Sequence, residues 1–211
     1  MTEQFARKME EGVKPLGIRL SEKQLEQFYD YFQFLVEKNK VMNLTGITEY
    51  EEVIQKHFLD SLSLIRVIPD IASQKLTVID LGTGAGFPGI PLKIAFPELD
   101  ITLMDSLNKR ILFLQEVIDA LGLKKVSAVH GRAEEMASNA THRQQYDFCV
   151  SRAVSNLAVL TEYCLPFVKK GGLFVSYKSA DSDAEIQEGK KAISILGGKL
   201  TSVDCVYRKV T

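Results

Sequence analysis

Hydrophobic and polar positions follow a helical period over the first part of the chain. Apolar residues recur at i, i+3 and i+4 through residues 25–36, and charged residues occupy the other positions. We interpret this stripe as core packing. The S-x-x-Q pattern of Ser21 and Gln24 is typical of a helix N-terminus. The sequence therefore predicts mainly helical structure over residues 1–45, followed by a further helix over residues 49–67.

From about residue 76 the pattern changes to short apolar runs that alternate with helical periods. The expected strands are 76–82, 100–105, 126–131, 146–153, 172–178 and 199–207, and the expected helices lie near 88–96, 107–121, 155–168 and 183–196. This alternation is typical of βαβ units in a mostly parallel, doubly wound sheet, the α/β Rossmann-like architecture. We expect an N-terminal helical extension at residues 1–70 and an α/β domain at residues 71–211.

Composition narrows the class of protein. Of 211 residues, 45% are hydrophobic and 25% are charged, as in an ordinary soluble globular protein. The absence of a long apolar run argues against a membrane span and a signal peptide. The three cysteines are far apart, which argues against a disulfide framework or a zinc site. We expect a cytoplasmic protein that neither associates with a membrane nor binds a metal. Its net charge of -1 means that nucleic-acid binding requires a local basic patch.

A glycine-rich loop follows the first expected strand. Asp80 begins the pattern D-x-G-x-G-x-G, whose glycines are Gly82, Gly84 and Gly86. Glycines permit unusual backbone angles and a close approach of a ligand, and ligands of open α/β sheets bind beyond the carboxyl ends of strands. Asp105 ends the second expected strand, where a carboxylate can accept hydrogen bonds from both ribose hydroxyls. These residues together indicate a site for a nucleoside cofactor.

The glycine spacing separates the possible cofactors. The dinucleotide fingerprint G-x-G-x-x-G requires a third glycine at position 87, where this chain has Phe87. A nicotinamide oxidoreductase is therefore disfavoured. The pattern resembles motif I of S-adenosylmethionine-dependent methyltransferases, in which the first acid lies near the amino-acid end of the cofactor. The alternative that this loop is only a tight strand-to-helix turn, with no ligand, remains open at this point.

Two further segments fall at the same rim of the expected sheet. In the methyltransferase class the turn after strand 3 borders the adenine, and Ala133 and Glu134 occupy that turn. Alternatively, Glu134 and Glu135 simply begin a helix, where acids interact favourably with the helix dipole. Arg152 ends the fourth apolar run. An arginine in a cleft requires an anionic or π-rich partner, whereas on the surface it forms an ordinary salt bridge.

Taken together, the segments resemble the bacterial 16S ribosomal RNA guanine-N7 methyltransferases of the RsmG (GidB) family. The similar segments are 38-KNKVMNLTGI-47, 57-HFLDSL-62, 79-IDLGTGAGFPGIPLKIAFP-97, 105-DSLNKRILFLQEV-117, 130-HGRAEE-135 and 151-SRAVSNL-157. The resemblance implies a class I S-adenosyl-L-methionine-dependent methyltransferase that acts on one guanine of the decoding region in 16S rRNA. Chains of this family continue into a last strand and a basic tail, so we expect both to be missing after 207-YRKVT-211.

The resemblance also implies a cofactor site. In it Gly82 lies in the loop, Phe87 packs beside the cofactor, Ala133 and Glu134 border the adenine, and Arg152 lines the cleft. We assign no catalytic residue, and Arg152 is the candidate for positioning substrate or cofactor. Guanine N7 has a free lone pair and carries no proton, so the transfer needs no general base.

The remaining expectations concern the histidines and the partner. His57 and His130 are candidates only for binding. Basic residues could together attract RNA. Those at or near the rim or on neighbouring helices are Lys93, Lys109, Arg110, Arg132, Arg152 and Lys178, and those of the N-terminal part are Lys38, Lys40 and Lys56. Because total basicity is weak, we expect a monomer that acts on 16S rRNA within a small subunit or an assembly intermediate. Two alternatives remain: a methyltransferase for another rRNA base or a small molecule, and a non-catalytic RNA- or ribosome-binding module.

Overall fold

The computed structural model describes residues 1–152, 155–178 and 182–204. The α-helices are α1 (Glu3–Val13), α2 (Glu22–Met42), α3 (Tyr50–Val53), α4 (Asp60–Leu62), α5 (Gly89–Ala95), α6 (Asn108–Ala120), α7 (Ala133–Met136), α8 (Leu157–Cys164) and α9 (Asp183–Ile195). The strands are β1 (Thr77–Leu81), β2 (Asp100–Asp105), β3 (Val126–His130), β4 (Tyr146–Arg152) and β5 (Val168–Tyr177). A π-helical turn spans Ile54–Leu59, and 3₁₀ turns span Lys14–Leu16, Ser63–Arg66, Pro69–Ala72 and Leu165–Phe167.

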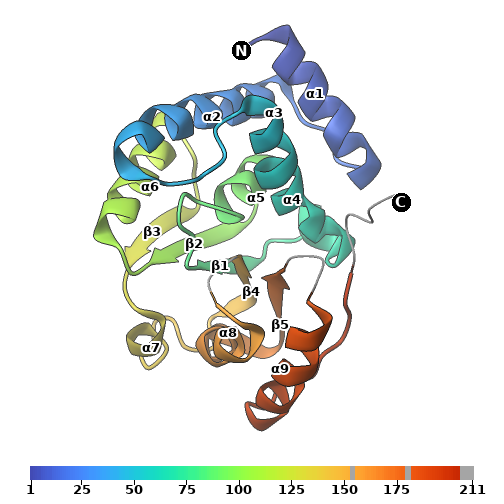
Figure 1. The fold of residues 1–211 in the computed structure, drawn as a ribbon, viewed down its shortest axis with the longest axis vertical. Helices are drawn as coiled ribbons and strands as arrows, with labels where there is room; N and C mark the ends of the chain where they lie inside the picture. Colours follow the sequence, from blue (N-terminus) through green and yellow to red (C-terminus); the bar gives the residue numbers. More distant parts are fainter. Residues whose placement is uncertain (153–154, 179–181, 205–211) are drawn as a thin grey trace.

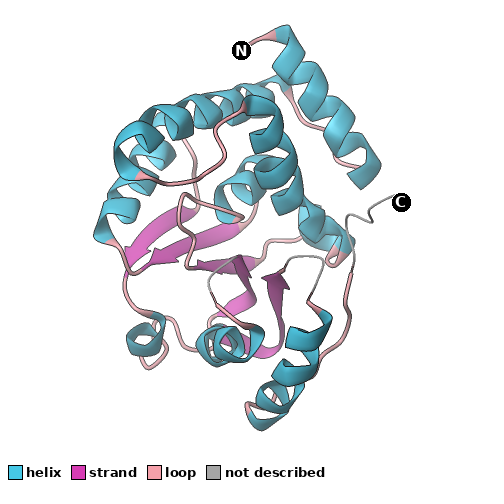
Figure 2. Ribbon diagram, viewed as in Figure 1, coloured by secondary structure: helices cyan, strands magenta, loops and turns pink. Residues whose placement is uncertain are grey.

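The five strands form one parallel sheet in the order β3-β2-β1-β4-β5. Helices α2, α5 and α6 cover one face, and α7, α8 and α9 lie on the other (Figures 1 and 2). Neighbouring strand residues point to opposite faces. Val78 thus belongs to the core beneath α2, whereas Ile79 belongs to the core against α8. The doubly wound α/β architecture predicted from the sequence is confirmed.

The N-terminal helices pack on the helices that cover one face of the sheet, since α2 contacts α5 and α6 and α1 contacts α2. The predicted capping box is present, because Ser21 Oγ accepts from the backbone N–H of Gln24 and the Gln24 side chain accepts from the N–H of Ser21. One hydrophobic core extends from Phe5 of α1 through Phe28 of α2 to Ile101 of β2. The helical extension therefore shares its core with the α/β part, and the domain boundary after residue 70 stays a prediction.

The predicted helix over residues 49–67 is helical but not uniform. α3 passes into the π-helical turn, then into α4 and a 3₁₀ turn. A π turn adds a residue to the helical period and frees backbone groups, and such turns occur often at functional sites. Here the carbonyl of Lys56, within the π turn, accepts a hydrogen bond from Arg152 at 3.1 Å.

Two other sequence expectations need correction. Residues 199–204 of the predicted last strand form no strand, because they lie exposed and have no ladder partner, and residues 205–207 lie outside the described ranges. Strand β5 begins at Val168 rather than at residue 172, because a register shift between Tyr146 and Phe148 lets Val168 pair with Tyr146. Within the described ranges, no helix is long and apolar enough to span a membrane.

Candidate functional site

The glycine-rich loop joins β1 to α5 at the carboxyl end of the central strand. Gly82, Gly84 and Gly86 have φ angles of 69°, 62° and 103°. These left-handed conformations are strained for residues with a side chain, so the predicted need for glycine is confirmed. Space is limiting as well at Gly86, where a Cβ atom would lie 2.7 Å from Ile90 Cγ1 and 2.9 Å from Tyr31 Oη.

Asp80 supports this loop from below. Its side chain is fully buried, and Oδ2 accepts hydrogen bonds from Thr83 Oγ1 and the Gly89 N–H, both at 2.7 Å. Burial raises the pKa of the carboxyl group to about 6. The second oxygen, Oδ1, is buried and has no hydrogen-bond partner. Buried carboxylate oxygens are normally satisfied, so Oδ1 is an unused acceptor beside the loop.

Sequence reasoning overlooked the tight packing that Gly89 provides. A Cβ atom at this first residue of α5 would lie 2.2 Å from Leu103 Cδ2 and 2.9 Å from Asp80 Oδ2. In the dinucleotide fingerprint, close contact of helix and strand is the role of the third glycine. In this chain a glycine two residues after Phe87 makes that contact. The signal was present in the sequence as the phrase GFPGIP.

Asp105 lies beside the loop at the end of β2. Its Oδ2 accepts from the Gly84 N–H at 2.9 Å, and Oδ1 accepts from the Leu107 N–H at 2.9 Å. Arg110 forms an ion pair with Oδ2 at 3.1 Å. The Asp105 side chain is only 2% exposed, and that of Arg110 is 33% exposed. Arg110 is thus the partly exposed partner of a buried carboxylate.

The turn after β3 adjoins the same rim. Asp105 pairs with His130 in the sheet register, and the Gly131 N–H donates to the Asp105 carbonyl at 3.1 Å. Ala133 and Glu134 begin the four-residue helix α7. The exposed Glu134 side chain lies 3.5 Å from Arg132. The structure thus agrees with the alternative in which the two acids begin a helix, and contact of Ala133 and Glu134 with an adenine stays a prediction.

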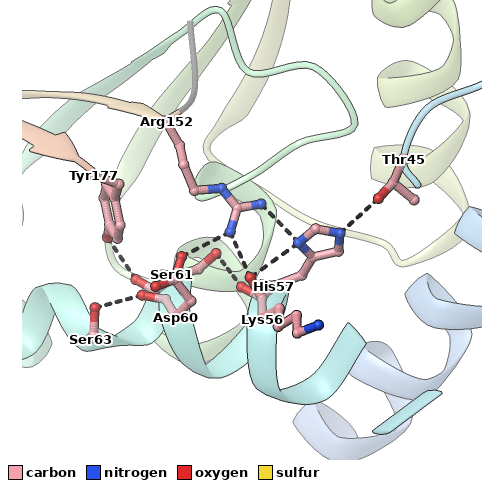
Figure 3. A network of polar contacts seen from close by, with 8 residues as sticks. All are labelled: Thr45, Lys56, His57, Asp60, Ser61, Ser63, Arg152 and Tyr177. Atoms are coloured by element: carbon pink, nitrogen blue, oxygen red, sulfur yellow. Dashed lines mark hydrogen bonds and ion pairs between the residues drawn. The ribbon is translucent and has the colours of Figure 1, made fainter. Parts of the chain in front are cut away.

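Arg152 joins the strand end to the N-terminal helices (Figure 3). Its Nη1 donates to Asp60 Oδ2 at 3.0 Å, and its Nη2 lies 3.1 Å from His57 Nδ1. The guanidinium also lies over the Phe87 ring, 4.9 Å from its centroid. Arg152 therefore has both an anionic and a π-rich partner. The side chains of Arg152 and Asp60 are 15% and 28% exposed, so the pair is more buried than an ordinary surface salt bridge.

His57 lies between this arginine and the loop of residues 43–47. Its ring stacks on Phe87 with centroids 4.4 Å apart. Nδ1 of His57 lies 3.1 Å from Arg152 Nη2, which can only donate, and 3.2 Å from the Lys56 carbonyl oxygen, which can only accept. The tautomer with its proton on Nε2 satisfies the Arg152 contact at Nδ1 and donates to Thr45 Oγ1 at 2.9 Å. Burial, followed by the charge of Arg152, lowers the pKa of His57 to about 4. His57 is therefore neutral at pH 7 and both of its nitrogens are engaged.

Sequence reasoning placed Arg152 at the rim but did not find its partners. Thr45, His57 and Asp60 all fall within segments that carried the family resemblance. No local pattern connects them to Arg152, because 92 residues separate Asp60 from it. The fold brings the predicted Gly82, Gly84, Gly86, Phe87, Asp80, Asp105 and Arg152 to one rim, with Ala133 and Glu134 on the neighbouring turn.

The candidate basic patch is smaller than expected. Lys93 is only 2% exposed, and its ammonium donates to the carbonyls of Pro97 and Leu99. It therefore cannot meet RNA, because its aliphatic stem lies in the core and its charge satisfies buried carbonyls. Other candidates are paired with acids: Lys38 with Glu116, Lys56 with Glu52, Arg110 with Asp105, Arg132 with Glu134, Arg152 with Asp60 and Lys178 with Glu185. Lys40 and Lys109 are exposed.

The site offers no evident metal centre. No group of three or more His, Cys, Asp or Glu side chains gathers in a metal-binding arrangement anywhere in the described part of the chain. Cys149 and Cys164 are buried and free. The polar groups at the rim are backbone amides and an arginine, which donate, and two aspartates, which accept. Such groups suit an organic cofactor with hydroxyl and amino groups.

Comparison with known proteins shows the family of this chain. The family described as rRNA small subunit methyltransferase G matches residues 24–211. A curated Ribosomal RNA small subunit methyltransferase G from Lachnoclostridium phytofermentans is 58% identical over 190 residues, which cover 90% of this chain and 78% of that protein. The protein of the same name from Alkaliphilus metalliredigens is 54% identical over 192 residues, which cover 91% of this chain and 80% of that protein.

Solved structures agree on the fold. P. horikoshii TYW2, crystallised in complex with MeSAdo, is similar with a TM-score of 0.50 and 14% identity, covering 60% of this chain and 49% of that chain. The chain has the Rossmann-like fold of S-adenosylmethionine-dependent methyltransferases. Because the family match extends over most of the sequence and the relatives are more than half identical, the chain belongs to the rRNA small subunit methyltransferase G family.

Proposed function

We propose that this protein transfers a methyl group from S-adenosyl-L-methionine to N7 of one guanine in 16S rRNA. The observation that carries the proposal is the contact between Asp105 Oδ2 and the Gly84 amide, 2.9 Å apart, in a chain of an rRNA methyltransferase family. The contact places a carboxylate suited to ribose hydroxyls beside a glycine loop. That loop lacks the G-x-G-x-x-G pattern of dinucleotide-binding proteins. The match to small-subunit rRNA methyltransferases supports the substrate class.

The residues present fit the proposed cofactor. Asp105 would accept from the ribose hydroxyls in place of Arg110, and the unpartnered Oδ1 of Asp80 is an acceptor suited to an ammonium group. Gly82 and Gly84 let the backbone approach the ligand. Ala133 and Glu134 would border the adenine, and Phe87 would form an apolar wall held in place by Arg152. S-adenosyl-L-methionine, when bound, supplies an activated methyl group on a sulfonium.

The chain's own task is then one of positioning. Guanine N7 is a nucleophile without deprotonation, so the enzyme must hold the base in line with the methyl group and exclude water. No general base is required, which is consistent with the engaged, neutral state of His57. Arg152 carries its charge beside the loop but is partly neutralised by Asp60. Its proposed role is to fix Phe87 and the strand end rather than to exchange protons.

The proposal is tested by methyl transfer to small ribosomal subunits that lack N7-methylguanosine. Tritium from labelled S-adenosyl-L-methionine is followed with the wild type, Gly82→Arg, Asp105→Asn and a surface control, Glu98→Gln. The label is mapped by chemical cleavage at N7-methylguanosine. We expect label at a single guanine with the wild type and the control, and loss of label with the two site variants. Thermal unfolding of each variant establishes that it is folded.

Other results would redirect the assignment. Label on a different base would refute the guanine-N7 part and keep the rRNA methyltransferase. Binding of the cofactor product S-adenosyl-L-homocysteine without transfer to any rRNA would favour a non-catalytic ribosome-binding module. Absence of cofactor binding by the wild type would refute the proposal altogether.

A further inference from the structure

Helix α2 presents three hydrogen-bond donors to three separate parts of the α/β fold. Gln24 Nε2 donates to the carbonyls of Ile94 and Ala95, at 2.8 and 3.0 Å, at the end of α5. Gln27 Nε2 donates to the Leu121 carbonyl at 2.8 Å, just beyond α6. The third donor is Tyr31, whose Oη reaches the glycine-rich loop. The spacing i, i+3 and i+7 places all three on one face of the helix.

The contacts of Gln24 and Gln27 satisfy carbonyls at the C-terminal ends of helices. The last carbonyls of a helix have no partner within it, and side-chain donors satisfy them. Gln24 and Gln27 therefore fix helix ends. Tyr31 differs, because its acceptor is the carbonyl of Ala85 in the middle of the loop, at 2.5 Å.

Tyr31 is well placed to hold this carbonyl. The residue is 0% exposed, and its ring packs against Phe58 and Phe87 with centroids 5.6 and 5.5 Å apart. Burial raises the pKa of the phenol well above its usual value. The hydroxyl therefore stays protonated near neutral pH and remains a donor. Because the ring is fully buried among these side chains, the hydrogen bond restricts the loop without ordering a flexible side chain.

The Ala85 carbonyl that Tyr31 holds lies between two glycines whose geometry is restricted. Gly84, one residue earlier, donates its N–H to Asp105 at 2.9 Å. Gly86, one residue later, has φ of 103°. A Cβ atom at this position would lie only 2.9 Å from Tyr31 Oη. The loop is thus held by the Asp105 carboxylate at the Gly84 N–H and by the Tyr31 hydroxyl at the Ala85 carbonyl. Its own backbone adds the N–H groups of Gly86 and Phe87, which both donate to the Thr83 carbonyl.

We propose that Tyr31 is a positioning residue for the cofactor, because its hydroxyl fixes the Ala85 carbonyl and thereby the orientation of the Gly84 amide against Asp105. The N-terminal helix α2 is then a part of the cofactor site that contributes no direct contact. This inference rests on the proposed function, since it concerns the affinity of the same site.

The alternative is that Tyr31 acts only in the core. Its ring would then contribute packing, and the hydroxyl would contribute general stability like the amides of Gln24 and Gln27. Tyr31→Phe separates these roles, because it keeps the ring and removes only the donor. Gln27→Leu is the matched control, since it removes one side-chain donor to one backbone carbonyl from the same helix face, away from the loop.

The experiment measures binding of S-adenosyl-L-homocysteine by calorimetry to the wild type and both variants, together with steady-state kinetics on small subunits. We expect Tyr31→Phe to weaken binding about tenfold and to raise the KM for S-adenosyl-L-methionine by a similar factor, with kcat retained at saturation. Gln27→Leu should bind within about twofold of the wild type, although both variants lower the unfolding temperature.

A second readout does not depend on activity. Hydrogen exchange of the 82–88 backbone amides in cofactor-free protein should be faster in Tyr31→Phe than in Gln27→Leu. Unchanged affinity and exchange in Tyr31→Phe would overturn the inference, and so would equal losses of affinity in the two variants. Failure of the wild type to bind S-adenosyl-L-homocysteine is a separate result, because it would refute the proposed function itself.

Discussion

Arg152 of β4 and Asp60 of α4 form an ion pair with Nη1 and Oδ2 3.0 Å apart, across 92 residues of sequence. This pair connects the carboxyl end of the sheet to the N-terminal helices. Because the same guanidinium contacts the Lys56 carbonyl, His57 and the Phe87 ring, the pair stands at the centre of a larger contact set. Breaking it should therefore affect both stability and the rim of the cofactor site.

The first prediction concerns the strength of this pair. A double-mutant cycle with Asp60→Ala and Arg152→Ala should give a coupling energy on the order of 1–2 kcal/mol, because removal of either partner leaves a partly desolvated charge. Urea unfolding of the four proteins provides the measurement. The matched control is the exposed Lys125–Glu98 pair, 2.9 Å apart, whose cycle should show little coupling because water screens it. Equal coupling in the two cycles would contradict the prediction.

The second prediction concerns the pH dependence of stability at His57. Its pKa is about 4 in the folded protein and 6.5 without perturbation. Between these values the unfolded chain binds more protons at this site, so the free energy of unfolding falls as pH falls from 6.5 towards 4. The loss by pH 5 should be on the order of 1 kcal/mol, after allowance for partial solvent access.

His57→Gln tests this sign, because glutamine keeps a donor and an acceptor and does not titrate. Urea unfolding of wild type and variant at pH 7.5, 6 and 5 should show the wild type losing stability relative to the variant as pH decreases. In the wild type the charges of Arg152 and Lys56 lower the pKa of the imidazole, and the hydrogen bond with the Lys56 carbonyl raises it. Other titrating groups, Asp80 included, are common to both proteins and largely cancel. A difference that is independent of pH would show that His57 does not titrate as described.

The arrangement of the sheet could be predicted from sequence because each strand and helix has its own local signal. Five apolar runs matched β1 to β5, and the alternation with helices predicts a parallel sheet. The carboxyl ends of parallel strands meet at one edge, so Asp80, Asp105 and Arg152 could be assigned to a common rim. The failures arose where local composition is ambiguous, as in residues 199–204, which have strand-like composition but no neighbouring strand in the described sheet.

The contacts within the site could not be predicted in the same way. Arg152 meets Asp60 directly after a π-helical turn, and hydrophobic periodicity does not reveal a π turn. Lys93 was expected at the surface because of its charge, yet its stem is buried and its ammonium satisfies backbone carbonyls. The hydrogen bond from Tyr31 to Ala85 likewise depends on tertiary packing, since Tyr31 forms part of an ordinary apolar stripe.

The third prediction separates stability from function at Asp80. Its pKa is about 6 in the folded protein, above the usual 3.8, so this carboxyl contributes stability at low pH that is lost as pH rises through 6. At pH 7.5 the charged group is a cost. Asp80→Asn can keep the acceptor for Thr83 and Gly89, and should be at least as stable as the wild type, by up to roughly 1 kcal/mol. Thermal unfolding at pH 5 and 7.5 checks this.

The same variant should bind S-adenosyl-L-homocysteine at least about tenfold more weakly. Its amide NH₂ would replace the unpartnered Oδ1 and would repel an ammonium group that the carboxylate attracts. Asp147→Asn is the contrasting control, because Asp147 accepts from the Thr77 N–H at 2.8 Å near the start of β4, far from the carboxyl rim. That variant should lose stability and keep affinity. Normal affinity in Asp80→Asn would remove Asp80 from the proposed site.

The last prediction concerns the state of the rRNA substrate. The protein has a net charge of -1, and several basic residues near the rim are already paired with acids, as Arg110 is with Asp105. Attraction to phosphates is therefore weak, and affinity must come from a surface that presents the guanine in a fixed position. Small subunits or assembly intermediates should be methylated at least about tenfold faster than deproteinised 16S rRNA at the same concentration and salt.

Initial rates of tritium transfer measure this difference, and subunits stripped of some proteins by high salt serve as the intermediate case. Equal rates on deproteinised and assembled rRNA would mean that the RNA alone carries the recognition.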